Sequence, residues 1–449
     1  MKVVKNLSIY DLKDICHKWV DKHTGNIEQK RLKLLSIPEL GYKEIKTSSY
    51  IYDQLQKFCK PEYIRRNIGL TGIKATVPCG NPDGINICLI CELDAVITPK
   101  HPNADSSSGA AHSCGHHMQM TTMLAAFEAI VSTDIIKNLF GRVTFMAIPA
   151  EEYVELEYRK KLKEEGEIRY FSGKQEFIYL GEFDDVDMAV MVHAHPDSKA
   201  GDVYINGGSL GFTAKTVEFL GKAAHAGASP DMGINALNAA TAAMMCIHMN
   251  RETFRDEDHV RIHPIITKGG DLVNIIPDKV SLETYVRAKT LSAMENAACK
   301  VDRSIRGACI AIGAKALVYN FPGYLPLVQD NALSTLVESN VLRLPEFKTL
   351  YDKVDMPGSS DIGDLSYIMP VIQPTIGGFE GEAHAVNFLE TDPVTSNSLA
   401  IKLVVDTVID VLAEGSKEGK RVKKNFIAKL SKKDYLDYLD MQEKSYYLE

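Results

Sequence analysis

Two hydrophobic patterns alternate along the first two hundred residues. Apolar residues recur at helical spacing in segments such as 48–59, and short, nearly continuous apolar runs follow these segments. These runs are the expected strands and cover residues 72–77, 85–95, 143–152 and 187–195. Apolar strands separated by helices indicate a parallel or mixed sheet covered by helices. We therefore predict an α/β domain with functional loops at the carboxyl ends of its strands.

A different pattern begins after the Gly-rich segment 206–212. Strands are expected over residues 213–221, 260–269 and 280–288, and helices over 234–250 and 292–313. After the Pro- and Gly-bearing segment 321–327, residues 359–378 resume the character of the first domain. We predict a discontinuous catalytic domain, residues 1–208 and 323–449, with an inserted α+β lid domain over residues 209–322.

Composition agrees with a large globular protein. A chain of 449 residues exceeds the usual size of a single core, so two domains are expected. The net charge of −8 supplies no global basic field, which argues against a nucleic-acid-binding protein. The basic segment 416–434 is interpreted as a solvated, amphipathic terminal helix with Phe426, Ile427 and Leu430 on its apolar side.

The chain offers no expected membrane segment and no expected disulfide framework. Charges throughout residues 1–23 argue against a secretory signal, and no later segment is long and apolar enough to span a membrane. Nine scattered cysteines, an odd number, favour reduced thiols, and hence a cytoplasmic protein. Cys88 and Cys91 form a C-x-x-C within an apolar run, where buried strand cysteines are favoured over a redox pair.

Two segments contain side chains that could bind metal. Cys114 and His116 flank Gly115 ahead of an apolar helix, and a thiolate and an imidazole at this spacing can bind one ion or bridge two. Glu151 and Glu152 directly follow an apolar strand. One of two such carboxylates can bind an ion while the other accepts a proton from a bound water. Each segment alone also has an ordinary interpretation, as a chance C-x-H or a solvated acidic turn.

Two further segments add histidines. His193 and His195 end the expected strand 187–195 and point to the same face, and His384 lies in a short loop after a Gly-rich turn. The combination is more informative than its members, because four loops near strand ends all carry side chains suited to metal. Together they supply five ligands, enough for two divalent ions that share the thiolate or another bridging group.

The ordered sequences ELDAV, HSCGHH, PAEE, MVHAHP and GEAH resemble those of a known family. This is the two-metal metallopeptidase family that contains aminoacylases, carboxypeptidase G and bacterial amino-acid amidohydrolases. The CGH triplet resembles the branch of aminobenzoyl-glutamate hydrolase and indole-acetyl-amino-acid hydrolase. The lid resembles the dimerisation domain of that branch, which implies a homodimer formed through the lid.

The resemblance implies a role for each matching residue. Five would be metal ligands: Cys114, His116, Glu152, His193 and His384. Glu151 would be the general acid/base, with Asp94 in a supporting role. In the lid, His225 would assist the tetrahedral intermediate, commonly from the partner subunit, and Asn274 and Arg287 would hold the substrate's carboxylate.

Two positions depart from the family pattern. His117 stands where close relatives have Asp or Asn, and is interpreted as a residue around the site rather than a ligand. Gln119 stands where many relatives have His, a difference expected to matter little.

These features predict an amidohydrolase with two divalent ions, Zn²⁺ or Mn²⁺, acting on a small molecule with a free carboxylate. Candidate substrates are aminobenzoyl-glutamate-like compounds, N-acyl amino acids and dipeptides. The alternative is a catalytically inactive metal-binding or interaction protein on the same fold. The presence of Glu151 favours the enzyme.

Overall fold

The computed structural model describes residues 7–448, which form two compact units. Unit 1 comprises the chain up to Gly207, Gln329–Val354 and Met369–Ala428, and unit 2 comprises Gly208–Val328, Asp355–Ile368 and the chain from Lys429 onward. Residues 1–6, part of the charged amino terminus discussed above, lie outside the described residues. None of the helices within residues 7–448 is long and apolar enough to cross a membrane.

Unit 1 is built around a mixed six-stranded sheet, which agrees with the expected α/β domain. Its strand order is β1 (Ile64–Ile68), β2 (Gly72–Pro78), β6 (Phe140–Ile148), β3 (Asn81–Glu92), β7 (Met188–Val190) and β16 (Val371–Ile372). The last four strands run parallel, whereas β1 and β2 are antiparallel additions. The parallel strands are buried along most of their length, as their apolar runs require.

A second, four-stranded sheet lies in the same unit. It consists of β15 (Thr349–Asp352), β9 (Asp202–Ile205), β17 (Thr375–Ile376) and β8 (His193–Ala194). Two short hairpins pair β4 (Val96–Ile97) with β5 (Ala110–Ala111) and β18 (Phe379–Glu380) with β19 (Leu389–Glu390). The single strand expected over 187–195 is therefore wrong: the chain leaves the large sheet after Val190 and enters the small one at His193.

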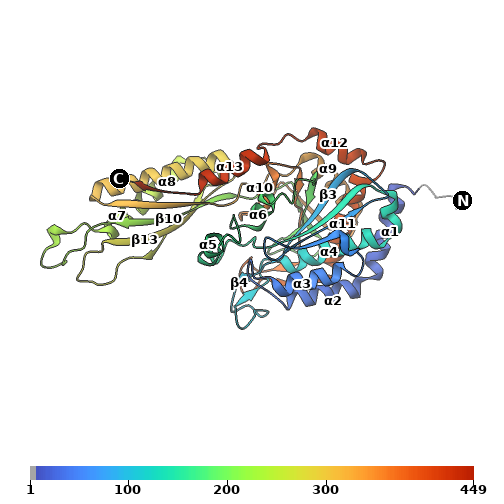
Figure 1. The fold of residues 1–449 in the computed structure, drawn as a ribbon, viewed down its shortest axis with the longest axis horizontal. Coiled ribbons are helices and arrows are strands. Elements are labelled where there is room, and N and C mark those ends of the chain that lie inside the picture. The colour runs from blue at the N-terminus through green and yellow to red at the C-terminus, as the bar shows by residue number, and fades with distance from the viewer. Residues whose placement is uncertain (1–6, 449) are drawn as a thin grey trace. The chain divides into compact units, whose positions relative to one another are not determined.

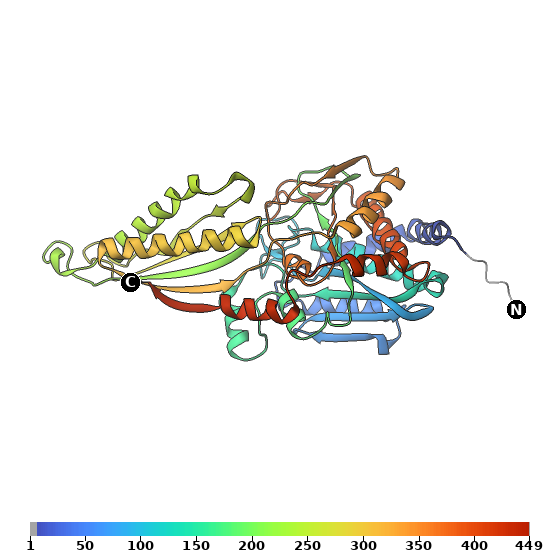
Figure 2. The same ribbon diagram turned by 90° about the horizontal axis from the view of Figure 1, so that it is seen from above.

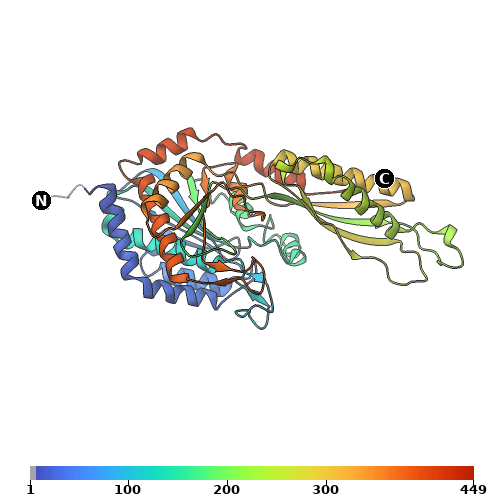
Figure 3. The same ribbon diagram turned by 180° about the vertical axis from the view of Figure 1, so that it is seen from behind.

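Nine helices described in unit 1 surround these sheets. They are α1 (Ile9–Lys22), α2 (Thr24–Leu35), α3 (Ile45–Leu55), α4 (His116–Ser132), α5 (Leu156–Glu164), α6 (Gly173–Tyr179), α9 (Asn331–Arg343), α11 (Pro393–Leu412) and α12 (Lys417–Asn425). Helices α4 and α11 pack against each other and against β3, with α1 and α2 outside them (Figures 1 and 3). Helix α4 is buried around nearly its whole circumference, and its buried residues include the polar His116, His117 and Gln119 as well as apolar side chains.

The basic segment 416–434 differs from its expected form. Helix α12 ends at Asn425, so Phe426, Ile427 and Leu430 lie outside it, and Ile427 is 86% exposed. The apolar contact of this helix is made instead by Val422, which is buried. A separate helix, α13 (Lys432–Gln442), follows. The charge pattern indicated a solvated helix correctly but could not show where the helix breaks.

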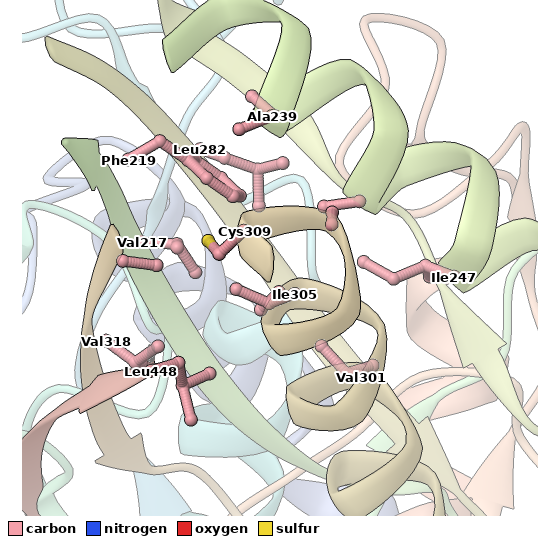
Figure 4. Packing of buried hydrophobic residues seen from close by; sticks show 14 of the residues in the cluster. Val217, Phe219, Ala239, Ile247, Leu282, Val301, Ile305, Cys309, Val318 and Leu448 are labelled. Carbon is pink, nitrogen blue, oxygen red and sulfur yellow. The ribbon is translucent and has the colours of Figure 1, made fainter. Parts of the chain in front are cut away.

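Unit 2 is an α+β unit with one antiparallel sheet. Its strand order is β11 (Arg261–Ile262), β13 (Lys279–Ala288), β10 (Gly211–Leu220), β14 (Lys315–Pro322) and β20 (Lys444–Leu448), with β12 (Ile265–Lys268) also paired to β13. Helices α7 (Ala236–Met249) and α8 (Leu291–Ile312) lie on one face of it (Figure 2). Their buried faces meet the sheet in a core that includes Phe219, Leu282 and Ile305 (Figure 4). The short helix α10 (Ile362–Ser366) also belongs to this unit.

The observed unit 2 differs from the expected lid, residues 209–322, because it also contains the carboxyl-terminal strand. Strand β20 pairs with β14 of the lid sheet, and Leu448 joins the core of unit 2. A buried polar network fastens the strand: Lys215 Nζ contacts Asp302 Oδ1 at 3.0 Å and Tyr446 Oη at 3.1 Å. Residues 355–368 also join unit 2, where Leu210 N donates to Gly358 O. Local periodicity carries no information about such distant pairing.

Candidate metal centre and active site

The expected ligands of unit 1 are brought together by the ends of several elements. Cys114 precedes α4 and His116 is the first residue of that helix, while His193 begins β8. Gly115 between the first two has a φ of 85°, and a Cβ there would lie 2.5 Å from Ala194 Cβ. Only glycine fits this tight turn, which brings α4 close to β8.

Two groups of three side chains could each hold an ion, and both contain Cys114. One group is Cys114, His116 and His193, and the other is Cys114, Glu152 and His384. In each group the candidate ligand atoms lie within 4.8 Å of one another. A thiolate common to both groups is the arrangement in which one side chain bridges two ions.

The separations of the ligand atoms fit metal coordination. Two ligands of one tetrahedral zinc ion lie about 3.3 Å apart for nitrogen and oxygen and about 3.6 Å apart for sulfur and nitrogen, given the usual bond lengths. Cys114 Sγ is 3.6 Å from His193 Nε2, and Glu152 Oε1 is 3.1 Å from His384 Nε2. The residues present therefore fit the ions that the sequence predicts.

Backbone contacts orient the imidazoles. His116 Nδ1 donates to the backbone oxygen of Asp94 at 2.9 Å, and His193 Nδ1 donates to that of Ala194, also at 2.9 Å. A carbonyl oxygen can only accept, so both rings keep Nε2 for another partner. His384 is anchored through its backbone, because its N–H donates to Ser113 O at 2.7 Å.

The charges of this cluster favour the ionised forms of its two acidic ligands, Cys114 and Glu152. Burial raises the pKa of Cys114, as does Glu152, but three neighbouring imidazoles outweigh both and lower it to about 6. Burial likewise raises the pKa of Glu152, yet His384 and His116 bring it down to about 2. The Cys114 thiolate in turn raises the pKa of His384 to about 11, although burial opposes this. A thiolate and a carboxylate are thus available at neutral pH.

The turn that carries both glutamates is strained and held by buried groups. Ala150 has a φ of 55°, which is uncommon for a residue with a side chain. Its N–H donates to Glu44 Oε1 at 2.9 Å, and Glu152 N–H donates to Asp94 Oδ2 at 2.8 Å. Asp94 therefore contacts the site through the backbone of Glu152 as well as through the ring of His116.

Arg159 supports the same turn from the other side. Its guanidinium is 1% exposed, donates to Phe171 O at 2.7 Å and also donates to Glu152 O. A buried guanidinium that satisfies backbone carbonyls fixes their positions firmly, because leaving either partner unpaired is costly. The backbone on both sides of Glu151 is therefore held by charged side chains.

Replacement of Glu44 by Gln is expected to change how stability depends on pH. Burial, and next the charge of Asp94, raise the pKa of Glu44 from 4.5 to about 7. The folded state then binds more protons than the unfolded state between these values, so the stability that Glu44 contributes at low pH is lost as pH rises toward 7. The melting temperature of Glu44→Gln relative to the wild type should be higher at pH 8 than at pH 5. An equal difference at both pH values would contradict the raised pKa.

Three polar residues close in sequence to the candidate ligands have partners outside the two ligand groups that contain Cys114. His117 Nε2 lies 3.1 Å from Glu390 Oε2, which also pairs with Arg31, and within residues 7–448 His117 belongs to none of the candidate metal groups. His195 stacks on Tyr204, with ring centroids 3.6 Å apart. Gln119 is fully buried, where its Nε2 donates to Glu92 Oε2 and Val192 O and its Oε1 accepts from Glu92 N. The expectation that Gln119 matters little therefore missed a structural link between β3 and the residue before His193.

The lid residues fall into two separate places within unit 2. His225 and Asn274 are exposed and adjacent, since His225 forms a bridge with Ile275 and Ala226 N donates to Asn274 O. His225 Nδ1 accepts from two backbone N–H groups, which leaves Nε2–H as an exposed donor. Arg287 lies near the opposite end of β13. Strand β13 begins at Lys279, shortly after Asn274, and at about 3.3 Å per residue Arg287 is about 26 Å from Lys279.

Arg287 is half-buried and suited to an anion. It lies over the rings of Phe212 and Tyr285, 5.6 Å from each centroid, and its Nη1 is 3.4 Å from Ser359 Oγ. Burial lowers its pKa, but a guanidinium stays charged at any physiological pH. Within the described chain no carboxylate forms an ion pair with Arg287, so the charge is available to a ligand.

Sequence reasoning missed four buried charged residues around the centre: Glu44, Glu92, Arg159 and Lys174. A signal existed for Glu92, because it ends an apolar strand just as Glu151 and Glu152 follow one. The others carry no local signal. A charged residue in a helix or loop is normally exposed, and only the packing of distant segments makes these the exceptions.

Comparison with known proteins yields consistent similarities. Residues 206–306 match the peptidase dimerisation domain, and lie largely in unit 2. The chain is 26% identical to the Xaa-Arg dipeptidase of Mus musculus, over 90% of this chain and 89% of that protein. It is 24% identical to a homolog of p-aminobenzoyl-glutamate hydrolase from Haemophilus influenzae, over 72% and 82% of the two chains.

Solved structures share the fold. A dinuclear metal-binding peptidase of Bacillus subtilis superposes with a TM-score of 0.68 at 20% identity, covering 87% of this chain and 99% of that one. An aminobenzoyl-glutamate utilization protein of Klebsiella pneumoniae gives a TM-score of 0.60 at 18% identity, covering 88% and 97%. The α/β fold with an inserted lid is thus shared over nearly the whole length of each chain.

Proposed function

We propose that this chain is a member of the two-metal metallopeptidase family of aminoacylases and carboxypeptidase G and that it hydrolyses an amide bond in small N-acyl amino acids or dipeptides, as its similarities support. One observation carries the proposal: two candidate ion sites share Cys114, and Glu151 lies beside them in a third group with His116. Unit 1 would be the catalytic domain and unit 2 the lid and dimerisation domain.

The ligands would be Cys114, His116, Glu152, His193 and His384, and zinc is the first candidate because a thiolate is a soft ligand. Two bound divalent ions would make a water molecule more acidic and polarise the scissile carbonyl. The side chain of Glu151 would accept the proton of that water and pass it to the leaving amine. Asp94 would keep His116 and the Glu152 backbone in place through the contacts described above.

His225 and Arg287 would act on different parts of the substrate. The exposed Nε2–H of His225 is a donor that can stabilise a developing oxyanion. Asn274, beside His225, adds an amide that can hydrogen-bond a carboxylate. Arg287 can bind a carboxylate with two parallel hydrogen bonds and would select substrates that end in an amino acid.

Arg287→Ala should lower kcat/KM for substrates with a free carboxylate at least about tenfold, because a charge-assisted pair of hydrogen bonds is lost. The corresponding amides or methyl esters should be affected far less. Arg261→Ala is the matched control, since the exposed Arg261 pairs with Arg287 across strands β11 and β13. Equal losses for acids and esters would remove Arg287 from carboxylate binding.

The separation within the lid supports a homodimer. His225 and Arg287 lie at opposite ends of the same sheet, too far apart to contact one small substrate from a single lid. A second subunit would supply His225 and Asn274 to the site.

Mixing two inactive variants tests this assembly. Glu151→Gln and His225→Ala subunits, each almost inactive alone, should recover activity after subunit exchange, up to about a quarter of the wild type when half of the dimers are mixed and each holds one complete site. Exchange would be followed by native mass spectrometry of differently tagged subunits. Mixed dimers without recovered activity would show that His225 does not act across subunits.

A hydrolysis screen on metal-reconstituted protein tests the function itself. The substrates are N-acetyl amino acids, aminobenzoyl-glutamate and dipeptides with a carboxyl-terminal Arg, Lys, Glu or Leu, each tried with zinc and with manganese. We expect turnover of at least one class that is lost on removal of metal by a chelator. Two bound ions without turnover of any substrate would favour a metal-binding protein on the same fold.

A further inference from the structure

The end of β3 carries a buried carboxylate that is not among the five expected ligands. Glu92 is 0% exposed, and its Oε1 pairs with Lys174 Nζ at 2.5 Å, where Lys174 is also 0% exposed. The other oxygen, Oε2, accepts from Gln119 Nε2 at 3.0 Å and lies 3.2 Å from His116 Nε2. Glu92 therefore uses one oxygen for Lys174 and directs the other toward His116.

The facing atoms of His116 and Glu92 are both electron-pair donors. His116 Nδ1 carries its hydrogen, because it donates to the backbone oxygen of Asp94. In the neutral ring Nε2 then holds a lone pair. No hydrogen-bond partner for His116 Nε2 exists among residues 7–448. A buried carboxylate oxygen and a buried imidazole nitrogen that face each other need a cation between them, which is either a proton on His116 Nε2 or a metal ion bound to both atoms.

The distance between the two atoms fits a shared ion. Nitrogen and oxygen ligands of one tetrahedral zinc ion lie about 3.3 Å apart, close to the 3.2 Å between His116 Nε2 and Glu92 Oε2. The distance between His116 Nε2 and Glu92 Oε2 is also similar to the 3.1 Å between Glu152 Oε1 and His384 Nε2 in the second candidate group. Glu92, His116 and Glu151 together form a set whose ligand atoms lie within 4.8 Å of one another.

We propose that Glu92 is a sixth protein ligand of the metal centre, with Oε2 bound to the ion that His116 holds. The inference rests on the proposed function, because it requires a two-ion centre. Lys174 and Gln119 are then positioning residues: they fix the rotamer of Glu92 so that a single oxygen is presented to the ion. The ion pair between Glu92 and Lys174 uses Oε1, which leaves Oε2 directed at the ring nitrogen that His116 would offer to an ion.

A crystal structure of the zinc-loaded protein tests the proposal directly. We expect Glu92 Oε2 at about 2.0–2.2 Å from one zinc ion, the usual distance for a carboxylate ligand. Two zinc ions with Glu92 more than about 3 Å from both would overturn the sixth ligand and leave the proposed function standing. Protein that takes up neither zinc nor manganese would overturn both.

A pair of double variants provides a second, solution test. Glu92→Gln/Lys174→Met removes the ligand together with the lysine that pairs with it, so neither charge of this pair is left buried without the other. The matched control is Lys13→Met/Asp410→Asn, which removes another ion pair of unit 1, with Lys13 Nζ 2.7 Å from Asp410 Oδ1. Melting temperatures would show that both variants are folded.

The measured quantities are zinc affinity and the visible spectrum of the cobalt-substituted protein. The Kd of one of the two zinc ions should rise at least about tenfold in the Glu92 variant, since even partners of ligands contribute 10–100-fold to metal affinity. The cobalt absorption should change because a donor atom is lost. The control should match the wild type in both measurements. Wild-type affinity and spectrum in the Glu92 variant would overturn the proposal.

Discussion

Glu151→Gln is expected to retain both metal ions and to lose hydrolysis by a factor of at least about 10²–10⁴, the usual contribution of a general acid/base. Glu151 is buried just after the end of β6, and glutamine has nearly the same shape, so the turn should keep its structure. An amide cannot accept the proton of the attacking water. Metal binding should persist, because Glu152 is the glutamate in the group with Cys114 and His384.

The measurement combines kcat/KM on the best substrate with metal content by mass spectrometry. Glu157→Gln is the matched control, because Glu157 is an exposed glutamate on the neighbouring helix α5 and should keep the wild-type rate. Normal turnover by Glu151→Gln would remove Glu151 from proton transfer. Loss of the metal together with activity would instead make Glu151 a ligand.

Cys114→Ser is expected to release both ions. Cys114 belongs to the candidate group with His116 and His193 and also to the group with Glu152 and His384, so its loss removes a ligand from each ion. The thiol has a pKa of about 6, so it is a thiolate at neutral pH despite its burial, which acts in the opposite direction. A serine hydroxyl stays protonated and is a poor metal ligand. Zinc content should fall from two ions to fewer than one per chain, and hydrolysis should fall with it.

Zinc content after gel filtration, with Kd from competition against a chelator, measures this effect. Cys16→Ser is the matched control: Cys16 is also a buried thiol of unit 1, and burial raises its pKa to about 12. It should keep both ions and full activity. Two ions bound at wild-type affinity in Cys114→Ser would show that the thiolate bridges nothing.

Much of the fold was predictable because buried strands and helices have characteristic patterns of apolar residues in the sequence. Continuous apolar runs indicated β3 and β6, and the change of pattern after residue 206 indicated a second, α+β unit; the α/β class and the family resemblance are both confirmed. Cys88 and Cys91 are buried in β3, as expected. The strand over 187–195 was mispredicted because an apolar run looks the same whether it stays in one sheet or passes between two.

The candidate site divides in a similar way. Strand ends and metal-capable residue types pointed to Cys114, His116, Glu152 and His193, and the structure brings their side chains together with His384. The resemblance, not the spacing, preferred His193 to His195. The structure adds a reason, because His195 is stacked on Tyr204 instead of facing Cys114.

The sequence by itself therefore determined the class of fold and the side chains that could bind metal, because hydrophobic period and residue chemistry are local properties. Only the tertiary structure decided which partners these side chains have. Glu92 and Lys174 are 82 positions apart, and β20 joins the lid sheet from the far end of the chain. Contacts at such separations depend on how distant segments pack, and that packing leaves no mark in the spacing of neighbouring residues.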